Sequence, residues 1–119
     1  MINQYNHELP KNSCFCIVGG DGLVGEQAKW LVKSIRSVYP HKRIYFGIPN
    51  TEEQSAKIEA GVNIVRLDFP IKDYSYSIKA GLLDWVDTQT THELKILMDS
   101  DCLVLDKIRL PNLNSDMYL

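Results

Sequence analysis

Short apolar runs typical of strands alternate with helical patterns along this chain, and this alternation constrains its fold more than any other feature. The first run, residues 14–18, is rich in strand-forming side chains and is broken at once by glycines. From residue 24 to residue 39, apolar side chains recur at spacings of three and four, which predicts an amphipathic helix that stops at Pro40. Further strands are predicted at residues 43–48, 63–68 and 94–98.

Two more helices complete the alternation. Residues 51–54 form a capping box, which predicts a short helix that ends at Gly61. A longer helix is predicted around the apolar side chains between Ile78 and Val86. The order β-α-β-α-β-α-β needs crossover connections, so the sequence predicts a Rossmann-like, mostly parallel α/β sheet with helices on both faces. The last strand lacks strict alternation, which is typical of a strand buried on both faces.

The length and the distribution of residues favour a single domain. A chain of 119 residues has room for one hydrophobic core. We expect residues 13–106 to form this domain, with a loose lead-in at 1–12 and an irregular tail at 107–119. We also expect both tryptophans to pack in the core.

Charge and composition exclude several classes of protein. A formal net charge of −2 argues against a nucleic-acid-binding protein, which would normally present a basic face. The first 13 residues are polar and lack the apolar segment of a signal peptide, and no apolar run approaches the roughly 18 residues that span a bilayer. The three cysteines do not suggest a disulfide framework. We therefore expect a cytoplasmic protein with buried free thiols and no transmembrane segment.

Two acids directly follow the fourth predicted strand, and strand packing does not need them. If the backbone stays extended, Asp99 and Asp101 project the same way. Two carboxylates this close repel each other unless a cation lies beside them. Mg²⁺ and Mn²⁺ suit such a pair, because proteins usually bind these ions with one or two carboxylates plus substrate phosphates. Asp99-Ser100-Asp101 therefore predicts a metal-diphosphate site, with an ordinary surface turn as the alternative.

A glycine-rich loop follows the first predicted strand. Residues 20–25 satisfy the pattern G-x-G-x-x-G between a strand and a helix, as in NAD(P)-binding Rossmann proteins. The second strand ends without the acid that would bind a ribose, and Asp21 would meet the pyrophosphate with like charge. A tight turn is the simpler interpretation. The carboxyl ends of parallel strands meet at one edge of a sheet, so this loop and the acids should lie close together.

Taken together, these segments resemble the opening half of a GT-A glycosyltransferase domain. The resemblance includes the first strand with the glycines and Asp21 behind it, and the helix that ends at Tyr39-Pro40. It also includes the acids within the apolar run 97–104. Residues 77–83 are similar to the segment whose basic residue approaches the nucleotide sugar in glycogenin-like and galactosyltransferase-like members. The resemblance extends over residues 13–106 and depends on order and spacing more than on any single motif.

This resemblance implies transfer of a sugar from a nucleoside diphosphate to an acceptor hydroxyl, with Mn²⁺ or Mg²⁺ as the cofactor. Asp101 would bind the metal, and Asp99 would bind the metal or the ribose. The glycines of the first loop would line the nucleotide pocket, and a lysine on the helix before the acids would offset the negative charge of the donor. The residues implied in nucleotide-sugar binding are Gly19, Gly20, Asp21, Lys79, Asp99 and Ser100.

The resemblance covers the donor-binding half of such enzymes, which are typically about twice as long. Their second half supplies the acceptor site and the base or nucleophile, so the acceptor is unknown and the chain is expected to be incomplete or inactive alone. A second copy or a companion chain could cover the sheet edge that the other half would occupy. Two other hypotheses remain open at this point, an NAD(P)-binding module and a non-enzymatic α/β interaction module.

Overall fold

The computed structural model describes residues 7–54, 57–68 and 74–110 of the chain. The predicted strands are present, as are two of the three predicted helices. Within the described ranges, no helix is both long and apolar enough to cross a membrane. In chain order the elements are β1 (Ser13–Val18), α1 (Gly22–Val38), β2 (Arg43–Pro49), β3 (Asn63–Leu67), α2 (Tyr74–Gln89) and β4 (Leu94–Met98).

The four strands form one parallel sheet in the order β3-β2-β1-β4. This arrangement confirms the predicted α/β class with a mostly parallel sheet. The chain moves outward from β1 to β3 and then returns to place β4 on the other side of β1. The direction of winding therefore reverses between β1 and β4, where Ile17 lies opposite Met98. At such a switch point the loops that follow the two strands diverge and leave room for a ligand.

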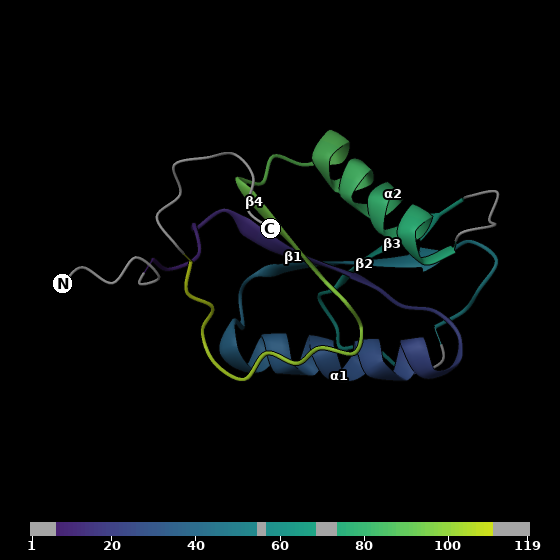
Figure 1. The fold of residues 1–119 in the computed structure, drawn as a ribbon, viewed down its shortest axis with the longest axis horizontal. Helices are drawn as coiled ribbons and strands as arrows, with labels where there is room; N and C mark the ends of the chain where they lie inside the picture. Colours follow the sequence, from purple (N-terminus) through teal and green to yellow (C-terminus); the bar gives the residue numbers. More distant parts are fainter. Residues whose placement is uncertain (1–6, 55–56, 69–73, 111–119) are drawn as a thin grey trace.

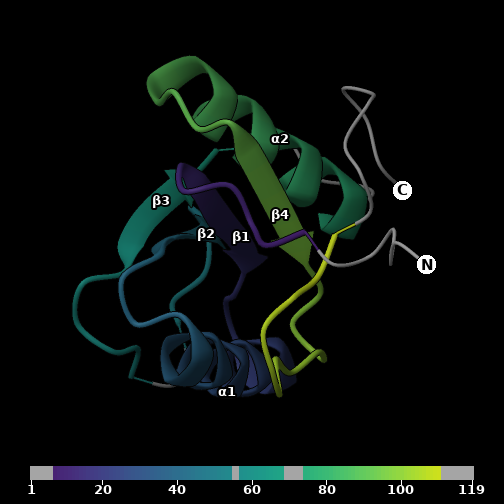
Figure 2. The same cartoon turned by 90° about the vertical axis from the view of Figure 1, so that its left-hand side faces the viewer.

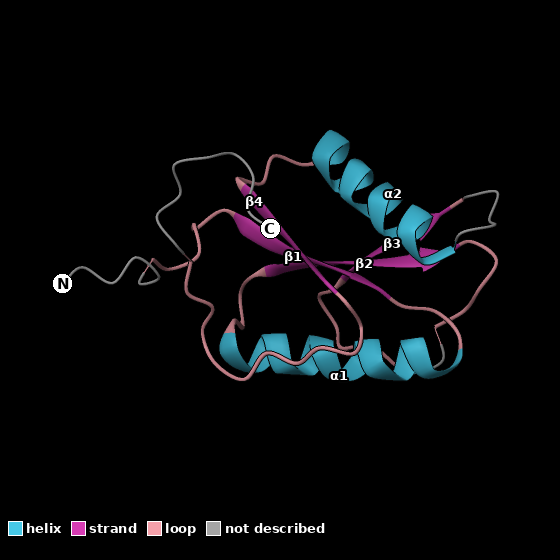
Figure 3. Ribbon diagram, in the orientation of Figure 1, coloured by secondary structure: helices cyan, strands magenta, loops and turns pink. Residues whose placement is uncertain are grey.

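One helix covers each face of the sheet, as the sequence predicts. Figures 1 and 2 show α1 on one side of the strands and α2 on the other, and Figure 3 shows the strands as a layer between the two helices. Alternate side chains of β1 enter the two layers, with Phe15 and Ile17 on the α1 side and Cys14 and Cys16 on the α2 side. Both cysteines are fully buried free thiols. The α1 layer also buries Ala28, Leu31, Val32, Ile35, Ile44 and Phe46, and the α2 layer buries Tyr45, Val65, Leu67, Ile78, Leu82 and Val86.

The two tryptophans differ in burial, and the expectation of a core position is wrong for Trp30. This side chain is 55% exposed, and the ammonium groups of Lys29 and Lys33 lie 5.0 and 5.2 Å from its ring centroid. In a helix of 3.6 residues per turn, Trp30 lies on the side of α1 roughly opposite the buried Ala28. Trp85 of α2 is partly buried and packs against the core beneath that helix.

The predicted helix at residues 51–61 is absent from the described part of that segment, residues 51–54 and 57–61. The polar side chains of its capping box hydrogen-bond across space instead of capping a helix. Glu52 and Gln54 accept hydrogen bonds from backbone N–H groups of the glycine loop, over distances of 3.0 and 2.9 Å. The side chains of a capping box can accept from any suitably placed backbone N–H. Here they accept from the N–H groups of the glycine loop and not from those of a helix of their own.

The prediction that residues 94–98 form a strand buried on both faces is also wrong. Among the described residues, β4 has β1 as its neighbour on one side and no strand on the other. Its side chains are partly buried at most, and Leu97 is 37% exposed. The apolar run suits an edge strand here because Ile96 and Met98 pack partly against the core on the α1 side.

After β4 the chain runs back along α1 in irregular conformation (Figure 1). The backbone N–H of Val104 donates to the Ser34 hydroxyl at 2.8 Å, and that of Ile108 donates to the Tyr39 hydroxyl at 2.6 Å. Leu110 then pairs with His7 in an antiparallel bridge. Residues 7–12 and 107–110 are thus joined at the amino-terminal end of the sheet. The rest of the predicted lead-in and tail, residues 1–6 and 111–119, lies outside the described residues.

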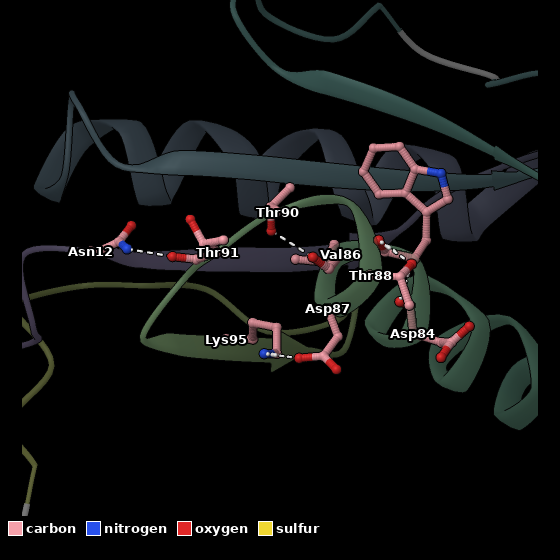
Figure 4. A network of polar contacts seen from close by, with 9 residues as sticks. Asn12, Asp84, Val86, Asp87, Thr88, Thr90, Thr91 and Lys95 are labelled. Carbon is pink, nitrogen blue, oxygen red and sulfur yellow. Dashed lines mark hydrogen bonds and ion pairs between the residues drawn. The ribbon is translucent and has the colours of Figure 1, made fainter.

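The connection between α2 and β4 is held by a network of polar contacts, shown in Figure 4. Lys95 of β4 forms an ion pair with Asp87 of α2, with 2.7 Å between Nζ and Oδ1. The Thr90 hydroxyl donates to the Val86 carbonyl at the end of the helix. The Asn12 amide donates to the Thr91 carbonyl at 2.6 Å. These contacts join the carboxyl end of α2 to the start of β4. They therefore also constrain the position of the start of α2 relative to the carboxyl end of β4.

Candidate functional site

A cavity of about 290 Å³ lies at the carboxyl ends of β1 and β4, where the winding of the sheet reverses. Four segments form its wall: the end of β1, the first turns of α1, the first turns of α2, and the turn after β4. The residues that line it are Val18, Val24, Gln27, Lys79, Met98, Asp99, Ser100 and Asp101.

The two predicted metal ligands line this cavity together, although the backbone between them is not extended. The Cys102 N–H donates to the Asp99 carbonyl at 3.0 Å, which closes a turn over residues 99–102. The chain must leave the sheet here to reach α1, and the turn makes that change of direction. Asp99 and Asp101 therefore share the cavity because of the turn and not because of the strand alternation we expected.

Lys79 is the positive charge of the cavity. Its ammonium forms an ion pair with the Asp99 carboxylate, and the two side chains are 29% and 58% exposed. Lys79 follows the buried Ile78 on α2, so packing of that helix on the sheet places the lysine above the end of β4. Lys79 and the two acids therefore line the same cavity.

Asp101 has a different environment from Asp99. The Cys102 thiol lies 3.9 Å from the Oδ1 of Asp101. Among the described residues, no lysine or arginine forms an ion pair with Asp101. The carboxylate is exposed and has its lone pairs available for a cation.

Gln27 is a cavity residue that sequence reasoning missed. The Ser100 hydroxyl lies 3.3 Å from its Oε1 and can donate to it, which leaves the Gln27 NH₂ group as a donor inside the cavity. Gln27 lies beside the apolar stripe of α1, next to Ala28, so the helical pattern treats it as an ordinary boundary residue. Only its contact with Ser100, which is 73 positions away, identifies it.

The glycine loop reaches the same edge of the sheet, but Gly19, Gly20 and Asp21 do not line the cavity. Their backbone N–H groups already have acceptors within the chain. The Gly19 N–H donates to the Gly47 carbonyl at 2.9 Å. The Gly20 N–H donates to the Gln54 side chain, and the Asp21 N–H donates to the Glu52 side chain. The Asp21 carboxylate in turn accepts from the Glu53 N–H at 3.3 Å.

Packing accounts for the two glycines directly after β1. A Cβ at Gly19 would lie 2.2 Å from two ring atoms of Phe46, and one at Gly20 would lie 2.7 Å from the Glu52 carboxylate. Gly20 also has a φ of 143°, which side chains other than hydrogen rarely allow. The loop thus has a structural reason for its sequence, and a pyrophosphate would have to displace Glu52 and Gln54 to bind there.

The donor set of the cavity fits a hard divalent cation only when the ligand supplies part of the coordination. Among the described residues there is no group of three or more His, Cys, Asp or Glu side chains arranged to hold a metal ion. Two carboxylates and a hydroxyl, from Asp99, Asp101 and Ser100, are present. Mg²⁺ and Mn²⁺ prefer six oxygen ligands, so the phosphates of a bound ligand and water would have to complete the shell.

Comparison with known proteins gives no relative for this chain. No family model matches the sequence, and no curated protein and no solved structure matches it. What the chain does must therefore be inferred from the residues of the cavity and from their position in the sheet.

Proposed function

We propose that this chain binds a nucleoside-diphosphate sugar in the cavity and acts as the donor-binding part of a glycosyltransferase. The observation that carries the proposal is the meeting of Asp99, Ser100, Asp101 and Lys79 around one cavity at the switch point of a parallel sheet. Ligands of such sheets bind at this position. Two acids, one hydroxyl and one ammonium are the groups that a metal-bound diphosphate requires.

The charges of the cavity suit a diphosphate and a divalent cation together better than either alone. Two carboxylates would repel a free diphosphate, and they lack enough partners to hold a free Mg²⁺ or Mn²⁺ tightly. Asp101 would hold the cation first, because Asp99 is already paired with Lys79. If Asp99 also helped to hold it, the Lys79 ammonium would be available to a phosphate oxygen. The cation and the diphosphate should therefore strengthen each other's binding.

Bound in this way, a divalent ion supplies Lewis-acid stabilisation of the diphosphate as it leaves the sugar. The protein's part is to hold the phosphates against Lys79 and to orient them with the NH₂ group of Gln27, whose Oε1 accepts from the Ser100 hydroxyl. The volume of about 290 Å³ suits the diphosphate and its ion, and the base and the sugar would extend beyond the cavity walls. The acceptor and the group that activates it would come from outside the cavity residues.

An NAD(P)-binding module is the weaker alternative, because the N–H groups of the glycine loop are occupied by Glu52 and Gln54. A non-enzymatic interaction module draws its support from β4, which has no second neighbour among the described residues. Titration with NADH and NADPH in the absence of a divalent cation separates the first alternative from our proposal, since we expect the cavity to bind a diphosphate only together with Mn²⁺ or Mg²⁺.

Calorimetry with UDP and GDP, each with and without Mn²⁺, tests the proposal. We expect binding of one of them that requires Mn²⁺ and that the Asp101→Asn variant loses by at least about tenfold, because the neutral amide is a poor ligand for a hard cation. The control is Asp84→Asn, which removes the same charge from an exposed position on α2 (Figure 4). Absence of metal-dependent binding of both nucleotides in the unmodified protein would refute the proposal.

A further inference from the structure

The opposite end of the sheet carries a concentration of positive charge that the proposed function does not use. It surrounds the turn between α1 and β2, at the end of α1 that lies farthest from the glycine loop (Figure 1). The structure has three cavities here, of about 420, 400 and 180 Å³. We call this region the basic end, and its basic side chains are Lys11, Arg36, His41, Lys42, Arg43, Lys107 and Arg109.

Among the residues that the structure describes, two acids, Glu8 and Glu59, line the same cavities. Glu8 is already paired with Arg109, with 3.3 Å between the charged atoms. Among the described residues, no other cation of the basic end forms an ion pair. The whole chain has a net charge of −2, so this excess of positive charge is local.

Lys42 lies at the centre of the basic end, because it lines all three cavities. Its ammonium donates to the Pro10 carbonyl at 2.7 Å and to the Lys11 carbonyl at 3.2 Å. Both acceptors are neutral, and burial lowers the pKa of Lys42 from its ordinary value. A partly buried ammonium without a counter-ion is stabilised by an anion placed beside it.

The surroundings of Lys42 are held in place by Arg36. Its guanidinium donates to the Lys42 carbonyl at 2.6 Å and to the Gly61 carbonyl at 3.2 Å. These bonds connect the turn after α1 to the segment before β3. The bonds of Arg36 therefore hold together the backbone segments that surround the cavities.

The residues that line the 400 Å³ cavity indicate the kind of anion that it could bind. Lys11, His41, Lys42 and Lys107 surround it, and Val38, Tyr39 and Pro40 form an apolar wall. A phosphate group offers a double negative charge and three acceptor oxygens to several lysines at once, whereas a single carboxylate offers less of both. The apolar wall suits a small organic body attached to the phosphate.

We propose that the basic end binds a small phosphate-bearing molecule, with Lys42 at the centre and Lys11, His41 and Lys107 around it. This site is independent of the metal-dependent site at the other end of the sheet. It needs no divalent cation, since the protein itself supplies the positive charge.

Titration with inorganic pyrophosphate in the presence of EDTA, followed by amide NMR, tests this proposal. Sodium chloride is present throughout at a constant ionic strength. The salt screens non-specific attraction of the anion to exposed charges. We expect saturable shifts of the amides of Lys11, His41, Lys42 and Lys107. The amides around Lys79 and Asp101 should not shift without a metal ion, so this outcome is distinguishable from the proposed function.

Two double variants with the same loss of charge provide the decisive comparison. Lys11→Gln with Lys107→Gln should weaken pyrophosphate binding about tenfold, because two charged donors are lost. Lys33→Gln with Lys57→Gln removes two lysines that line none of the three cavities and should leave the affinity unchanged. All four lysines are exposed, so each variant should fold. Equal weakening by both double variants, or shifts that do not saturate, would overturn the proposal and leave an ordinary solvated basic surface.

Discussion

At the scale of single residues, the charge inside the cavity is set by which side chains form ion pairs with one another. Lys79 compensates Asp99, and Asp101 stands without a cation among the described residues. An ion pair this exposed contributes about 0–1 kcal/mol to stability. The ion pair therefore contributes little to folding.

Replacement of Lys79 separates the proposed role in ligand binding from the contribution to folding. Lys79→Met should weaken metal-dependent nucleotide binding about tenfold, because the charge that faces the phosphate is lost. Its free energy of unfolding should change by less than about 1 kcal/mol. Lys79→Arg keeps the charge and should retain most of the affinity. Calorimetry and urea denaturation measure the two effects, and a large loss of stability with normal binding would contradict the assigned role.

His92 gives the fold a dependence on pH. Its Nε2 lies 2.8 Å from the Tyr45 hydroxyl, and its Nδ1 is buried without a hydrogen-bond partner among the described residues. Burial lowers the pKa of His92, and the positive charges of Arg43 and Lys95 act in the same direction. The folded protein therefore prefers the neutral imidazole.

This preference predicts a loss of stability in acid. Below the ordinary histidine pKa of about 6.5, the unfolded chain binds a proton that the folded chain still rejects, so the free energy of unfolding falls as the pH falls. The fall continues until the pH reaches the lowered folded pKa. His92→Gln should show a smaller difference between urea midpoints at pH 7.5 and pH 5.5 than the unmodified protein. An identical difference would show that His92 does not contribute.

At the scale of elements, the glycine loop after β1 and the segment 51–54 after β2 act as one unit. Gln54 accepts from the Gly20 N–H and donates to the Gly25 carbonyl at 2.7 Å, so it connects both sides of the loop. The same side chain could not have started a helix while making these bonds. The absence of the short helix and the occupation of the loop amides are therefore one structural fact.

Steric space at the end of β1 predicts how this unit responds to substitution. Gly19→Ala would place a methyl group 2.2 Å from the buried Phe46 ring and should cost about 3 kcal/mol. Gly22→Ala is the matched control, because nothing lies within 4 Å of its Cβ position and only the φ of 67° opposes it. That strain should cost about 1–2 kcal/mol. Urea denaturation measures both values, and an equal cost would contradict the packing argument.

At the scale of the whole molecule, the distribution of charge and the open side of the sheet determine what the protein can contact. The acids of the cavity and the cations of the basic end lie at opposite ends of the strands. The outer side of β4 has no strand beside it among the described residues. A strand edge with exposed apolar side chains such as Leu97 is a template for pairing with another chain.

We expect a second copy to be the partner of this edge. In an antiparallel pair centred on Leu97, Lys95 of each copy would lie opposite Asp99 of the other, which gives complementary charges. Leu97→Lys should therefore abolish a concentration-dependent dimer in analytical ultracentrifugation. Leu105→Lys, at a position that is 87% exposed and lies away from β4, should leave it intact. A monomer at all concentrations would exclude this pairing.

The sequence determined the features that depend on neighbouring residues. The spacing of apolar side chains in residues 24–38 and the breaks at Gly19 and Pro40 were enough to predict α1 and the strands on either side of it. The alternation of elements then required a parallel sheet, and that topology brought the acids after β4 to the same edge as the glycine loop. Packing periodicity is local, so it can be recognised without knowing the rest of the chain.

Tertiary structure alone decided the features that join distant residues. These include the edge position of β4, the contact of Ser100 with Gln27, the ion pair of Lys79 with Asp99, and the binding of residues 52–54 to the glycine loop. In each case a local pattern allowed more than one partner, and the choice depended on which backbone or side chain the folded sheet brought within reach. A hydrogen bond or an ion pair forms with whatever group lies nearest, and only the assembled fold determines that group.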